Sequence, residues 1–202
     1  MKTLGAGGTI VLLPGVFTAC DDDDDPIAPP EGVTLDFGSD FGVLNYAYAL
    51  EQLEAAFYTQ VVANFYANAS ADEQTVLTDL RDHEVAHRDF FQAALGDEAI
   101  PTLDTDFSGV NFSDRSSVLM TAMTFEDLGV AAYNGAAMFL SDPDFLTVAG
   151  KIVSVEARHA SVIRTLLGVS FAPDAFDMGM APSAVLTAAD PFIDNDISVI
   201  NA

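Results

Sequence analysis

Two short motifs hold the residue types that could bind metal ions. Each places a glutamate three residues before a histidine, as Glu84 with His87 and as Glu156 with His159. On a helix, side chains at this spacing lie on one face, about one turn apart. Two of the chain's three histidines belong to these motifs, so histidine is concentrated in one pattern. The sequence therefore predicts two helices that each point a carboxylate and an imidazole in the same direction.

A second repeated pattern lies upstream of each motif. Glu51 is followed seven residues later by Tyr58, and Glu126 is followed seven residues later by Tyr133. Each Glu–Tyr pair precedes one Glu-x-x-His motif, so the same unit occurs twice. Glu54 is an alternative metal ligand from the first helix, because it lies one turn from Glu51. The repeated spacing to tyrosine favours Glu51 and makes Glu54, Tyr58 and Tyr133 candidates for positions next to the ligands.

Four amphipathic helices are predicted to carry these residues. Apolar residues recur every three or four positions, which is the spacing of a buried helical stripe. The predicted helices span 41–66, 73–95, 114–140 and 145–167. In each helix a candidate glutamate interrupts the apolar stripe. We therefore expect the ionisable groups to occupy core positions.

The connections predict how the helices are arranged. The segments 68–72 and 141–144 are short turns, so the helices that they join should run antiparallel. The segment 96–112 is longer than a helix hairpin requires and can cross the whole length of a bundle. Asp40 and Ser113 are expected to be the N-caps of the first and third helices. The sequence thus predicts two antiparallel helix pairs joined by a long crossover.

Buried ionisable groups on four helices require compensation. An unpaired buried ion costs several kcal/mol even after relaxation, and no Lys or Arg shares the apolar stripes. Two divalent cations would compensate, because four glutamates and two histidines are the ligand set of a dinuclear carboxylate site. The candidate ligands are Glu51, Glu84, His87, Glu126, Glu156 and His159. His83 lies off this face, so we expect it at the surface or behind the ligands.

Five segments carry a resemblance to a known family. They are LNYAYALEQLEAAFY (44–58), HEVAH (83–87), FEDLGVAAYNGAA (125–137), VEARHA (155–160) and ADPFI (189–193). In these segments the sequence resembles the ferritin-like superfamily, in particular bacterial ferritin-like domain proteins of the desiccation-related type. The resemblance runs from Phe37 to Ile193. It implies an all-α, ferritin-like four-helix bundle, up-down, then a long crossover, then up-down.

The resemblance also implies a function. Glu84 and Glu156 would bridge two iron ions, or one iron and one manganese, while Glu51 and Glu126 would be terminal ligands and each site histidine would hold one ion. Such a centre would oxidise Fe(II) or reduce oxygen or peroxide. The expected partners are therefore metal ions with oxygen or peroxide, and a second copy of the chain in a homodimer. The alternative is a non-catalytic envelope or stress protein that keeps the bundle with at most a structural metal.

The N-terminus predicts export and a lipid anchor. Residues 1–19 hold Lys2 and then an apolar stretch ending in small residues before the single cysteine, which is typical of a signal peptide with a lipobox. Lipidation gives Cys20 a purpose, since a lone cysteine cannot form an internal disulfide. An ordinary signal peptide and an unprocessed N-terminus are the alternatives. The expected location is the cell envelope, on its periplasmic or outer surface. The expected segments are a signal peptide (1–19), an acidic, Pro-rich tether (20–36), the bundle (37–168) and an irregular C-terminal tail packed on the bundle (169–202).

The charge composition excludes one class of partner. Seven basic residues stand against 31 acidic ones, which gives a net charge of −24. Nucleic-acid binding needs clustered Lys and Arg to neutralise phosphates, so nucleic acid is excluded as a partner. No run of about 18 apolar residues is present, so we expect a membrane contact only through the lipid.

Overall fold

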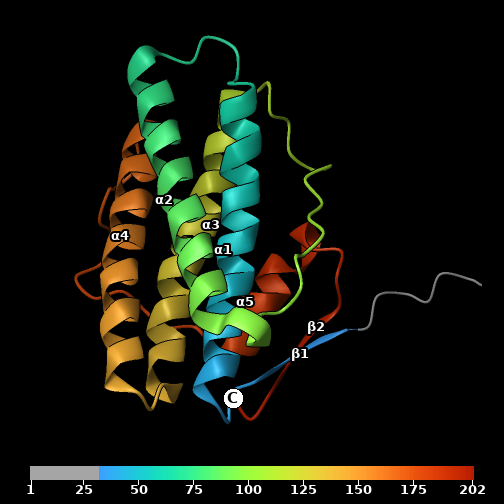
Figure 1. Cartoon of the computed structure of the whole chain (residues 1–202). Helices are drawn as coiled ribbons and strands as arrows, with labels where there is room; N and C mark the ends of the chain where they lie inside the picture. Colours follow the sequence, from blue (N-terminus) through green and yellow to red (C-terminus); the bar gives the residue numbers. More distant parts are fainter. Residues whose placement is uncertain (1–31) are drawn as a thin grey trace, which may run out of the picture.

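The predicted all-α fold with a four-helix bundle is confirmed. The computed structural model describes residues 32–202, so the signal peptide, Cys20 and most of the predicted tether lie outside the described residues. Four long helices stand side by side (Figure 1). They are α1 (Asp40–Ala63), α2 (Ala71–Leu95), α3 (Arg115–Ala136) and α4 (Pro143–Leu167). Short 3-10 turns cover Gly96–Glu98, Ala137–Phe139 and Asp190–Phe192.

The long connection between α2 and α3 crosses the length of the bundle beside α1 (Figure 1). Its end is fixed by a hydrogen bond from the Ala67 backbone N–H, in the α1–α2 turn, to the Ser113 carbonyl. The side chains of Asn45 and Gln52 on α1 exchange hydrogen bonds with backbone groups of the crossover. These contacts bring α3 back to the end of the bundle where α2 begins, as the length of the connection predicts.

The N-caps of α1 and α3 differ by one residue from the prediction. Ser39 caps α1 and Asp114 caps α3, each with an extended backbone and a side-chain oxygen that accepts a helix N–H. Asp40 and Ser113 were therefore the wrong choices. The Asp40 carboxylate accepts backbone N–H groups of the α3–α4 turn instead, at 2.8 Å. This contact ties the two helix pairs together at one end.

A two-stranded parallel sheet corrects the prediction for both ends of the described chain. The strand β1 (Val33–Asp36) pairs with β2 (Ile197–Ile200) in register from Val33 with Ile197 to Asp36 with Ile200. Val33 and Leu35 are buried. The last four residues of the predicted tether therefore belong to the folded body, and the end of the tail is a strand.

The tail also packs against the outside of α3. It contains α5 (Pro182–Ala189). Before α5, the Met180 N–H donates to the Ala131 carbonyl at 2.9 Å. A Cβ at Gly135 would lie 1.9 Å from the Met180 oxygen, so only glycine lets the tail backbone pass here. Within residues 32–202, no helix combines the length and the hydropathy that crossing a bilayer requires.

Candidate metal centre

The structure brings together all six candidate ligands inside the bundle. Glu51 comes from α1, Glu84 and His87 from α2, Glu126 from α3, and Glu156 and His159 from α4. The four glutamates are at most 1% exposed and His159 is 3% exposed, so water does not solvate these groups. The side chain of His87 is 13% exposed and is the most open of the six. The Glu-x-x-His spacing places each pair on the inward face of its helix, as predicted.

Two groups of donor atoms share two glutamates. Around His87, the Nδ1 atom lies 3.0 Å from Glu156 Oε1 and 3.4 Å from oxygens of Glu51 and Glu84. Around His159, the Nδ1 atom lies 2.8 Å from Glu84 Oε1, 3.4 Å from Glu126 Oε2 and 3.6 Å from Glu156 Oε2. In each group the donor atoms lie within 4.8 Å of one another. Glu84 and Glu156 belong to both groups, so they lie between two possible ion positions.

Among residues 32–202, the donor atoms at this centre form no hydrogen bond, and their closest polar neighbours are the other carboxylates and imidazoles of the centre. The unpartnered atoms are Oε2 of Glu51, both oxygens of Glu84 and Glu156, Oε2 of Glu126, and Nδ1 of His87 and His159. The arginine ion pairs of this part of the chain involve Asp82, Asp89, Glu73 and Asp127. Carboxylate and imidazole groups are ligands that divalent metal ions take in proteins. The residues present therefore fit a metal centre.

Two buried tyrosines hold the remaining oxygens of the outer glutamates. The Tyr58 hydroxyl on α1 donates to Glu126 Oε1 on α3, and the Tyr133 hydroxyl on α3 donates to Glu51 Oε1 on α1. Burial raises the pKa of both phenols well above 10, and nearby carboxylates raise it further, so both hydroxyls stay protonated. Each tyrosine leaves the other oxygen of its glutamate free to face the centre.

Without metal, protons neutralise the site. Burial lowers the pKa of both histidines, but the surrounding carboxylates outweigh it and raise the pKa of His87 and of His159 to about 12. Burial also raises the pKa of Glu51 and of Glu126. Burial disfavours the ionised form of Glu84 as well, but the imidazoles of His159 and His87 stabilise that form more strongly and lower the pKa of Glu84. The metal-free centre thus favours protonated histidines and an ionised Glu84, and its outer glutamates keep their protons to a higher pH than free glutamates do.

Glu54 is a fifth buried carboxyl group beside the centre, but it lies outside both groups of donor atoms. It is 4% exposed. A Cβ added at Gly129 on α3 would lie 3.2 Å from Glu54 Oε1 and 3.7 Å from Glu156 Oε2. Glu54 therefore occupies space that the missing side chain of Gly129 leaves free. The repeat contains the signal for this arrangement, because Gly129 stands at the position relative to Glu126 that Glu54 has relative to Glu51.

His83 lies behind one of the candidate ligands. Its Nδ1 atom is 2.9 Å from Nε2 of His159, and the two rings are within 11° of parallel. His83 itself is exposed. A hydrogen bond at Nε2 orients His159 so that its Nδ1 atom faces the carboxylates, a role that an outer partner commonly has at a metal-binding histidine.

The comparison with known proteins supports this interpretation of the centre. A family model described as a ferritin-like domain matches residues 39–169. That span contains α1 to α4 and all six candidate ligands. No curated protein matches the chain.

Proposed function

The chain belongs to the ferritin-like domain family, and from this premise we propose that it binds two metal ions and oxidises Fe(II) with oxygen or peroxide. The ions are two irons, or one iron and one manganese, held by the six residues of the centre. The observation that carries the proposal is the set of buried donor atoms without hydrogen-bond partners, contributed by four helices and arranged in two groups that share Glu84 and Glu156.

A bound pair of iron ions would supply two electrons, one from each Fe(II), which convert O₂ and two protons to H₂O₂, or H₂O₂ and two protons to two waters. The chain's own residues provide charge balance and rigidity. Four carboxylates match the four positive charges of two divalent ions. Tyr58 and Tyr133 each fix one oxygen of an outer glutamate, so these carboxylates are held by α1 and α3 together. Burial keeps bulk water from competing for the ions.

The test combines metal content with Fe(II) oxidation. We expect the purified chain to bind two ions and to oxidise added Fe(II), and we expect Glu84→Ala with His87→Ala to lose both properties. Asp79→Ala is the matched control, because it removes an exposed carboxylate from the same helix. Circular dichroism of the metal-free proteins checks that each variant folds. Bound metal without oxidation would overturn the oxidase and leave the non-catalytic alternative, a stress protein of the envelope.

We also propose that the protein is a lipoprotein of the cell envelope, related to the desiccation-related type. The support is the signal-like segment before Cys20 and the acidic, Pro-rich stretch after it. Cys20→Ser should release the protein from membranes into the soluble fraction. Retention of the variant in the membrane would contradict the anchor without affecting the metal centre.

A further inference from the structure

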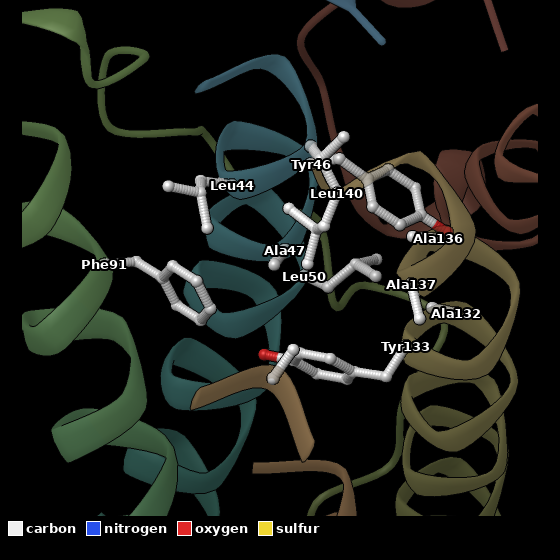
Figure 2. A pocket seen from close by; sticks show the side chains of 12 residues that line it. Leu44, Tyr46, Ala47, Leu50, Phe91, Ala132, Tyr133, Ala136, Ala137 and Leu140 are labelled. Atoms are coloured by element: carbon white, nitrogen blue, oxygen red, sulfur yellow. The ribbon is translucent and has the colours of Figure 1, made fainter. Parts of the chain in front are cut away.

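An apolar cavity lies next to the candidate metal centre. Its lining comes from all four bundle helices and from the α3–α4 connection, and it includes Leu50 and Tyr133. Tyr133 runs along one edge of the cavity (Figure 2), and its hydroxyl donates to Glu51 of the centre. Leu50 precedes Glu51 on α1. The same residues thus border the cavity on one side and contact or adjoin a candidate ligand on the other.

Small side chains create the space in this cavity. Five alanines line it, together with leucines, a valine and one phenylalanine; they are Ala47, Ala132, Ala136, Ala137 and Ala149. The centre of a water-sized molecule can move through about 20 Å³ of this cavity, so the cavity has room for one small molecule. Ala137 and Ala149 are only half-buried, so the cavity extends toward the surface at the α3–α4 connection.

The polarity of the lining selects the occupant. A buried water needs two to four polar partners, and the lining side chains carry only the hydroxyls of Tyr46 and Tyr133. The Tyr133 hydroxyl is already engaged by Glu51. The Tyr46 hydroxyl has no hydrogen-bond partner among residues 32–202 and lies beside Ala136 (Figure 2), so it offers a water one partner only. A small apolar molecule therefore fits better than water or peroxide, which would lose hydrogen bonds on entry.

We propose that this cavity binds molecular oxygen, an apolar diatomic molecule, beside Tyr133 on its way to the centre. The inference rests on the proposed function, because the centre is where oxygen would be consumed. It adds a route to the centre that only one of the two oxidants would use. Oxygen can pass through the apolar cavity, whereas peroxide must reach the centre another way.

Xenon is the probe for the cavity, because it is apolar and is detected directly in pressurised crystals. We expect one xenon atom in the cavity of the unaltered chain and none in Ala136→Val, whose added methyl groups fill it. Ala149→Val fills the outer part of the cavity and serves as a second variant if Ala136→Val folds poorly. Ala94→Val is the control, because it makes the same change at an exposed helical position.

Oxidation kinetics complete the test. In the filled variants the oxygen concentration for half-maximal Fe(II) oxidation should rise severalfold, while oxidation driven by peroxide stays unchanged. The inference fails if no xenon binds in the cavity, if the filled variants keep the oxygen dependence of the unaltered chain, or if they lose oxidation by oxygen and by peroxide equally. None of these results contradicts the proposed function. If the unaltered chain binds xenon but oxidises no Fe(II), the proposed function fails, and the role in oxygen delivery fails with it.

Discussion

Metal binding should release protons, because protons occupy the centre in the metal-free chain. His87 and His159 each have a pKa raised to about 12 by the surrounding carboxylates. Both are therefore protonated at pH 7, and each must lose one proton to offer Nδ1 to an ion. The pKa of Glu51 and of Glu126 is raised by burial, so these two groups add further protons.

The structure sets the size of this effect. The two histidines account for two protons per chain, and the outer glutamates, whose pKa is also raised, add to that number. Glu84 contributes none, because its pKa is lowered and it is already ionised. Each released proton strengthens the apparent affinity about tenfold per pH unit. Two protons therefore correspond to about a hundredfold per pH unit near neutrality.

Isothermal titration calorimetry measures the released protons. The metal-free chain is titrated with Zn(II), which has no redox chemistry, at pH 7 in buffers that differ in ionisation enthalpy. The dependence of the observed heat on that enthalpy gives the number of protons. His87→Gln should release one proton fewer, whereas Asp79→Ala should match the unaltered chain. Binding of two ions without proton release would refute the electrostatic account of the centre.

Three further predictions concern the metal-free chain. Its free energy of unfolding should fall as pH rises above 6.5, by up to roughly 3 kcal/mol per pH unit, because the two site histidines keep protons that the unfolded chain loses. Urea unfolding in the presence of a chelator measures this fall, and a flat profile contradicts it. Gly150→Ala should gain roughly 1 kcal/mol of stability from helix propensity, because nothing lies within 4 Å of the added Cβ. Gly129→Ala should fail to gain this, because its Cβ would lie 3.2 Å from Glu54. Equal shifts of the melting temperature for the two variants would rule this out. Tyr58→Phe should cost about 1–3 kcal/mol of stability, because it leaves a buried carboxyl oxygen of Glu126 without its hydrogen-bond donor. An unchanged melting temperature would count against that contact.

The sequence predicted the bundle and the meeting of the six residues because both depend on local spacing. The periodicity of three and four places Glu84 with His87, and Glu156 with His159, on the inward stripe of their helices. The length of the α2–α3 connection predicts the crossover. Repetition of the Glu–Tyr spacing selects Glu51, which the structure places within 3.4 Å of His87 while Glu54 lies outside both groups of donor atoms.

The features that the sequence did not predict depend on contacts between distant segments. Only four residues alternate in β1, and their partner strand begins at Ile197, so no local pattern identified residues 33–36 as part of the fold. The packing of Glu54 over Gly129 requires the relative position of α1 and α3. The contact of His83 with His159 likewise requires the rotation of α2 against α4. Helical spacing predicts which face of its helix a residue lies on, but it does not predict which other element packs against that face.

The most direct test of the centre is the position of bound metal in crystals soaked in Mn(II), located by anomalous scattering. The account predicts two peaks about 3.5–4 Å apart, both in contact with Glu84 and Glu156, one next to His87 and the other next to His159. Peaks only at surface carboxylates, or no peak between the four helices, would contradict it.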